Sequence, residues 1–162
     1  MRAEFSGDVA FVNSGGIRQE LMAGQVTLRN VYNIMPFGNK VITVEATAEQ
    51  INRMLEFNIG GTHGIWQASG IKYSYDTTKP NGQKIISCSI GGNPIDLTDT
   101  VKKYKVVAID YLLERGDEGS KILEETTGKV YTGANLLDIV VEYIKKHSPV
   151  DAQIEGRIIK LK

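Results

Sequence analysis

Apolar residues at every second position predict several short strands along the chain. Residues 40–46, KVITVEA, alternate so that at least one face of the strand is buried. Residues 70–90 predict a hairpin, because the turn-rich segment TTKPNGQ separates two alternating arms. The predicted strands are residues 8–12, 40–46, the two arms within 70–90, the start of 104–113, and 154–161.

Apolar residues three or four positions apart predict two longer helices. The first follows Thr47 and Gln50, which have the spacing of a capping box, and it ends at the paired glycines 60–61. The second covers residues 132–147, with an apolar stripe formed by Leu136, Ile139, Val140, Tyr143 and Ile144. A short helical turn is predicted within 27–39, and another helix at the end of 104–113. Few helices and several hairpins indicate an α+β fold with mixed, mostly antiparallel sheet layers.

Composition limits the partners that this chain can take. The 162 residues suit one domain with a real core, and the 19 basic residues are balanced by 19 acidic ones. We therefore expect no nucleic acid partner, because no large basic field is available to hold a polyanion. No apolar run is long enough to span a bilayer, so we expect no membrane insertion.

The sequence contains no complete set of catalytic groups. Its two histidines, His63 and His147, are too few for a hydrolytic two-metal centre, and no carboxylate cluster accompanies them. A phosphate-binding P-loop and a G-x-S-x-G nucleophile motif are both missing. The single cysteine, Cys88, lies in a strand-like run without a neighbouring histidine, which favours a buried apolar role.

Two segments could serve either structure or binding. In NSGGIR, the glycines at 15 and 16 could simply make a tight turn that leaves Arg18 in solvent. They could equally bring the backbone close to a ligand and aim Arg18 at a phosphate, which a guanidinium grips with two parallel hydrogen bonds. In MPFGN, Phe37 could cap the core or offer a flat face to a base.

A third segment, AIDYLLERGDEG, leaves a similar choice. Asp117 stands in a glycine turn, where an aspartate usually binds its own backbone, although it could also accept hydrogen bonds from two ribose hydroxyls. A fourth segment, GIWQASGIKY, contains Trp66, which is expected to be buried.

Taken in order, these motifs resemble those of one family. The segments FVNSGGIR, VYNIMPFGNKV, WQASGIKYSYD, YLLERGDEG and EGRI follow one another as in the C-terminal domain of the 5'-nucleotidase family. That family includes UDP-sugar hydrolases and 2',3'-cyclic nucleotide phosphodiesterases. The resemblance covers residues 8–159, and NSGGIR and PFGN are its most specific parts. It implies the 5'-nucleotidase C-terminal domain fold for the whole of residues 1–162.

The resemblance also implies a function for this chain. It would be the substrate-recognition domain of a metal-dependent phosphohydrolase, holding a nucleotide or nucleoside for nucleotide catabolism. An N-terminal metallophosphatase domain, absent from this chain, would carry two divalent metal ions and the chemistry, so the isolated chain is predicted to be inactive. No cofactor is expected in this chain itself. Relatives are mostly extracytoplasmic, in the periplasm, in the cell wall or secreted, which implies the same compartment here.

By position, the resemblance assigns eight substrate-binding residues. Arg18 would meet the phosphate, Phe37 and Tyr111 would sandwich the base, and Asp117 would hold the ribose hydroxyls. Asn39 would hydrogen-bond the edge of the base, and Asn13 would contact the nucleoside. The backbone of Gly15 and Gly16 would lie near the phosphate.

Two departures from the family pattern stand out. A tyrosine at position 111 replaces the usual phenylalanine, and Arg115 replaces a glycine beside Asp117. If that glycine needs a positive φ, Arg115 strains the turn. Two alternatives remain: an interaction module that uses the tripeptide RGD at 115–117, and a structural domain that has lost its pocket.

Overall fold

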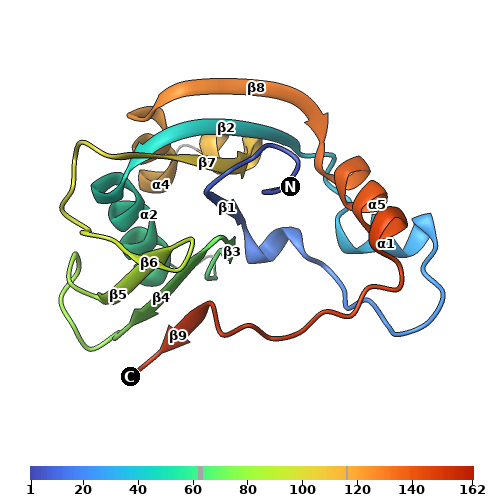
Figure 1. Cartoon of the computed structure of the whole chain (residues 1–162), viewed down its shortest axis with the longest axis horizontal. Coiled ribbons are helices and arrows are strands. Elements are labelled where there is room, and N and C mark those ends of the chain that lie inside the picture. The colour runs from blue at the N-terminus through green and yellow to red at the C-terminus, as the bar shows by residue number, and fades with distance from the viewer. Residues whose placement is uncertain (62–63, 116) are drawn as a thin grey trace.

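The computed structural model describes residues 1–61, 64–115 and 117–162. Its strands form two mixed sheets, and in each sheet a single strand pair is parallel while the others are antiparallel. Together with the helices in Figure 1, this confirms the predicted α+β class. In spatial order, the larger sheet contains β3 (Gln67–Ser69), β1 (Val9–Val12), β7 (Lys103–Ile109), β2 (Lys40–Thr47) and β8 (Thr127–Asn135), and the smaller one β6 (Asn93–Pro94), β5 (Ile85–Ile90), β4 (Ile71–Tyr75) and β9 (Ile158–Lys160).

In the described part of the chain, five α-helices and one 3-10 turn lie around these sheets. Figure 1 shows α1 and α5 together at one end of the larger sheet, with α2 and α4 at the other end. A long segment after α5 then returns across the molecule to β9. The helices are α1 (Leu28–Ile34), α2 (Ala48–Gly60), α3 (Asp110–Glu114), α4 (Glu118–Glu124) and α5 (Leu136–His147), and the 3-10 turn η1 covers Ser14–Gly16.

Helix α2 begins as the capping box predicts. The Gln50 amide donates to Thr47 Oγ1 over 3.2 Å, and the Thr47 amide donates to Gln50 Oε1 over 3.0 Å. Its apolar residues Ile51, Met54 and Leu55 are at most 1% exposed and pack into the core. The box thus satisfies free helix-end donors at the point where the apolar face meets the sheet.

The second long helix starts later than its sequence pattern indicates. Residues 132–135 belong to β8, which pairs with β2, and α5 begins only at Leu136. Asn135 marks the change, since its Oδ1 accepts a hydrogen bond from the Leu137 amide over 2.9 Å. The last strand is also shorter than predicted, because residues 154–157 lie outside β9. The sequence pattern missed β3, β6, β8 and α4 altogether.

The core is formed by strands of both sheets together with α2, α3 and α4. Trp66 is 2% exposed and packs beside Phe11 in the larger sheet, as predicted. Cys88 is also buried, and this burial raises the pKa of its thiol to about 12. The thiol therefore stays protonated and has an apolar packing role.

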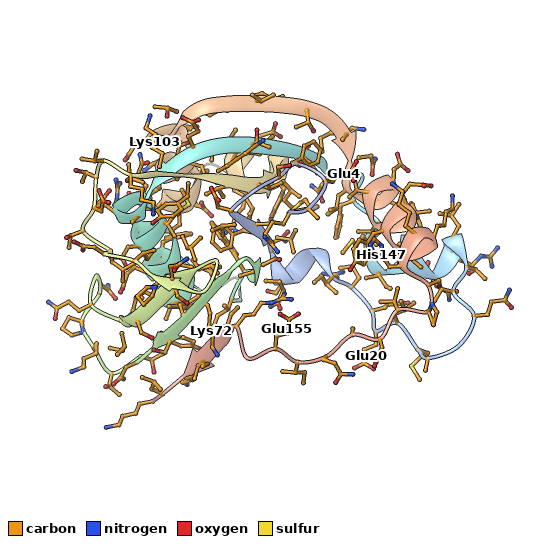
Figure 2. All side chains as sticks on the ribbon, in the orientation of Figure 1. Glu4, Glu20, Lys72, Lys103, His147 and Glu155 are labelled. Carbon is orange, nitrogen blue, oxygen red and sulfur yellow. The ribbon has the colours of Figure 1, made fainter. Side chains whose placement is uncertain are left out.

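Charges of both signs are spread over the surface. Figure 2 shows Glu20 and Lys103 on separate parts of the molecule, while Lys72 and Glu155 lie near one another. No described helix is long and apolar enough to cross a membrane.

Candidate functional site

Strand register brings three distant segments to one edge of the larger sheet. Strand β1 runs parallel to β7, and β2 runs antiparallel to it with Val41 opposite Ile109. The carboxyl ends of β1 and β7 therefore meet the beginning of β2. The segments that carry the sequence motifs follow or precede these ends, at residues 13–18, 35–39 and 110–117.

The turn after β1 needs glycine for a reason other than the one predicted. Neither Gly15 nor Gly16 has a positive φ, so a turn of this shape is open to other residues. A Cβ at Gly16, however, would lie 2.9 Å from Asn13 Oδ1, inside normal contact distance. Gly16 therefore makes room for the Asn13 side chain, whose buried Oδ1 has no hydrogen-bond partner within the described residues.

Arg18 is held by the backbone and by one ring. Its amide donates to Ile34 O over 2.8 Å, which ties the turn to the end of α1. Its Nη1 donates to Gly15 O over 3.1 Å, and its guanidinium carbon lies 5.8 Å from the centre of the Phe37 ring. No carboxylate pairs with Arg18 in the described part of the chain. Its charge is thus available to an anion.

Asn39 is oriented by Asp110, a residue that the sequence motifs did not single out. Asn39 Nδ2 donates to Asp110 Oδ1 over 3.2 Å. The same carboxylate accepts from the amide of Lys40 over 2.9 Å and from the amide of Tyr111 over 2.8 Å. Asp110 therefore fixes both Asn39 and the first turn of α3, and the amide oxygen of Asn39 has no hydrogen-bond donor among the described residues. An aspartate directly after a strand and at a helix start was the available signal.

Tyr111, Arg115 and Asp117 form a chain of contacts on the other side. The Arg115 guanidinium carbon lies 5.6 Å from the centre of the Tyr111 ring, and its Nη2 lies 2.5 Å from Asp117 Oδ2. Asp117 Oδ1 accepts from the Ser120 amide over 3.0 Å and so caps α4. Arg115 has φ −62° and ψ −24°, so the strain considered for this position is not present.

These segments enclose one cavity of about 440 Å³. This volume lies within the range of small-molecule sites. Phe37 is 58% and Tyr111 47% exposed, although large aromatic rings are usually buried. The residues that line the cavity are Asn13, Gly15, Arg18, Phe37, Asn39, Tyr111 and Arg115.

Six of the eight predicted binding residues therefore share this cavity. Gly16 instead lines a neighbouring space of about 10 Å³, which is too small for a nucleotide. Asp117 is outside the cavity lining, and Arg115, which was not predicted as a binding residue, takes a place in it. The binding roles of all eight residues stay predictions.

Catalytic groups are scarce near the cavity. No cluster of three or more histidine, cysteine, aspartate or glutamate side chains suited to a metal ion occurs in residues 1–61, 64–115 and 117–162. His147 lies on α5, where its Nδ1 is 2.8 Å from Tyr143 O, and His63 lies outside the described residues.

The RGD alternative gains no support from the structure. The Arg115 side chain is 8% exposed and is paired with Asp117, so the two charged groups contact one another instead of pointing into solvent. The middle residue of the tripeptide, Gly116, lies outside the described residues.

Comparison with known proteins agrees with the sequence motifs and the fold. The family model for the 5'-nucleotidase C-terminal domain matches residues 1–125. A 5'-nucleotidase-related protein of Glossina morsitans morsitans is 29% identical over 160 residues, which cover 93% of this chain and 29% of that protein. The trifunctional nucleotide phosphoesterase protein YfkN of Bacillus subtilis (strain 168) is 30% identical over 158 residues, or 93% of this chain and 11% of that protein.

A solved structure supports the same comparison. The crystal structure of a 5'-nucleotidase precursor from Thermus thermophilus superposes with a TM-score of 0.87 at 27% identity, covering 99% of this chain and 32% of that one. The chain thus spans less than a third of the length of each of these relatives.

Proposed function

Because this chain belongs to the 5'-nucleotidase C-terminal domain family, we propose that it is the part of a nucleotide phosphohydrolase that binds the substrate. The cavity at the edge of the larger sheet is its binding site. One observation carries the proposal. Arg18 and two exposed rings, Phe37 and Tyr111, come from three separate segments of the sequence and line the same cavity.

The chemistry of the cavity suits a nucleoside monophosphate. Arg18 has no carboxylate partner among the described residues and can bind a pair of phosphate oxygens. The two rings offer stacking faces to a base, and stacking of this kind is worth about 1–3 kcal/mol per base. The amide oxygen of Asn39, oriented by Asp110, can accept a hydrogen bond from the edge of the base.

Bond cleavage belongs to another part of the parent protein in this proposal. An N-terminal metallophosphatase domain with two divalent metal ions would receive the phosphate that this chain presents. The described residues contain no metal-binding cluster to do so themselves. We further propose an extracytoplasmic location, and one of the relatives is a snake venom 5'-nucleotidase.

Calorimetry on the purified chain tests the proposal. AMP, GMP, CMP and UMP are titrated beside adenosine, and binding of at least one nucleotide is expected, with no turnover when Mg²⁺ or Mn²⁺ is added. Arg18→Ala should weaken nucleotide binding about tenfold or more, the loss expected for a charge-assisted contact, and should change nucleoside binding much less. Arg29→Ala, an exposed arginine of α1, is the matched control.

A second pair of variants tests the stacking faces. Phe37→Ala should weaken the nucleotide and the nucleoside alike, by about tenfold. Tyr32→Ala, which removes an exposed ring from α1 outside the cavity, should change neither. No heat at millimolar ligand would show that the domain has lost its pocket. Phosphate release by the purified chain, lost on substitution within it, would contradict the division of labour.

A further inference from the structure

The cavity contains cations but no carboxylate among the described residues. Its charged groups are the guanidiniums of Arg18 and Arg115, and its other polar side chains are the amides of Asn13 and Asn39 and the phenol of Tyr111. A guanidinium can only donate hydrogen bonds. The two hydroxyls of a ribose are recognised most strongly by a carboxylate that accepts from them, as in dinucleotide-binding folds. The lining of this cavity lacks such an acceptor.

Asp110, next to Tyr111 in the sequence, already accepts from Asn39 Nδ2 and from the amides of Lys40 and Tyr111. The acid that the resemblance assigns to the ribose hydroxyls is Asp117, and both of its oxygens lie against other groups of the chain. Oδ1 accepts the Ser120 amide at the start of α4. Oδ2 lies 2.5 Å from Arg115 Nη2 as an ion pair, and that oxygen makes no hydrogen bond with other described residues. The Asp117 side chain is 25% exposed, and its residue is absent from the cavity lining.

Arg115 is fixed firmly enough to keep this arrangement. Its side chain is 8% exposed, and its guanidinium lies over the ring of Tyr111 while it holds Asp117. If Asp117 turned away from Arg115 to accept a hydrogen bond from a ribose hydroxyl, the nearly buried guanidinium of Arg115 would lose its counter-charge. Removing one partner of a buried pair is strongly unfavourable, so a neutral hydroxyl competes poorly with Arg115.

We propose that Arg115 determines sugar specificity by holding Asp117 away from the ligand, so that the cavity binds 2'-deoxyribonucleotides as well as ribonucleotides. This inference rests on the proposed function, because it concerns the sugar part of the same site. Arg115 acts here as a positioning residue. The base and the phosphate supply the binding energy, and the 2'-hydroxyl adds little.

The test measures a ratio of affinities in four versions of the 162-residue chain. Calorimetry gives the Kd of AMP and of 2'-deoxy-AMP, together with the GMP, CMP and UMP pairs, and the base that binds best is used. In the unaltered chain, the two Kd values should agree within about twofold. Arg115→Gly frees the carboxylate and should favour the ribonucleotide by about tenfold, the factor for one hydrogen bond to a charged acceptor.

Two further variants separate this effect from damage to the loop. Arg115→Met keeps an unbranched stem beside Tyr111 without the charge, and it should shift the ratio in the same direction as Arg115→Gly. Arg115→Gly combined with Asp117→Asn removes the freed carboxylate and should return the ratio to about one. A shift that survives in this double variant contradicts the role of Asp117.

The outcomes for this inference and for the proposed function differ. If the unaltered chain prefers the ribonucleotide by tenfold or more, Arg115 does not withdraw the acid, while the proposed function stands. If Arg115→Gly and Arg115→Met both leave the ratio unchanged, the inference is likewise wrong. If neither nucleotide of any pair binds, both proposals fail together.

Discussion

Replacing Asp110 by alanine tests how the site is attached to the sheet. The carboxylate of Asp110 joins the start of β2 to the start of α3 by accepting from the amides of Lys40 and Tyr111 and from Asn39 Nδ2. Asp110→Ala removes all three hydrogen bonds at once. It also removes a negative charge from the first turn of α3, where the helix dipole favours one.

The expected cost in stability follows from the exposure of these bonds. A hydrogen bond to a charged group contributes about 1.5–3 kcal/mol. Two of the three lie at the surface, where water replaces the lost acceptor, so the sum stays well below three full bonds. We expect a loss of about 2 kcal/mol in the free energy of unfolding. For a chain of this size, that lowers Tm by about 4–8 °C.

The assay combines urea unfolding with nucleotide calorimetry. Asp110→Ala should weaken nucleotide binding by about tenfold or more, because Asn39 and the first turn of α3 lose their common support. Asp8→Ala is the matched control, since Asp8 Oδ2 accepts the Lys105 amide over 2.8 Å at a place outside the cavity lining. It should reduce stability and leave nucleotide affinity unchanged.

Urea unfolding tests whether the hydrogen bonds of Asp110 stabilise the fold, and calorimetry tests whether they support nucleotide binding. Unchanged unfolding of Asp110→Ala would show that the three hydrogen bonds contribute nothing, whatever the chain binds. Lower stability with unchanged affinity would show that Asn39 does not need Asp110 for binding. Equal losses of affinity in Asp110→Ala and Asp8→Ala would attribute the effect to stability alone.

Two further predictions concern the fold. Gly70 and Gly82 share a φ of about +80°, but a Cβ at Gly70 would lie 2.0 Å from the backbone oxygen of Asp8, while nothing lies within 4 Å at Gly82. Gly70→Ala should therefore cost about 3 kcal/mol or more and Gly82→Ala about 1 kcal/mol in urea unfolding, and equal costs would refute the close approach. Because burial raises the pKa of Cys88 to about 12, Ellman's reagent at pH 8.5 should react at least tenfold more slowly with the native chain than with the unfolded chain. The free energy of unfolding contributed by this thiol is present below pH 9 and should fall between about pH 9 and 12, more steeply than in Cys88→Ala.

The sequence predicted the elements with strong local signals and missed those defined by long-range pairing. The capping box at Thr47 placed the start of α2 correctly. In contrast, residues 132–135 were assigned to the helix, although Asn135 is an N-cap signal directly before Leu136. Their pairing with β2, some ninety residues earlier in the chain, makes them the end of strand β8. Strands of two or three residues, such as β3 and β6, are too short for alternation to show.

For the candidate site, the motifs indicated which residues to consider, and the register determined which of them meet. Asp110 was missed because an aspartate at a helix start usually has a purely local role. Arg115 was treated as a source of strain, since sequence alone does not show that its φ is negative or that it reaches Asp117 and Tyr111. Contacts between side chains two to four residues apart in a loop depend on backbone conformation, which no periodicity predicts.

The chemistry of the cavity also explains why binding and cleavage fall to different parts of the parent protein in the proposed function. Within the described residues, the lining contains guanidiniums, amides and aromatic rings, and no imidazole, thiol or carboxylate. Guanidinium and amide groups cannot take up a proton near neutral pH, so they cannot activate a water molecule. They can hold a phosphate and a base in a fixed orientation, and such binding energy accelerates a reaction only when it positions the substrate for groups located elsewhere. The side chains of this cavity are thus suited to binding a nucleotide and unsuited to hydrolysing it.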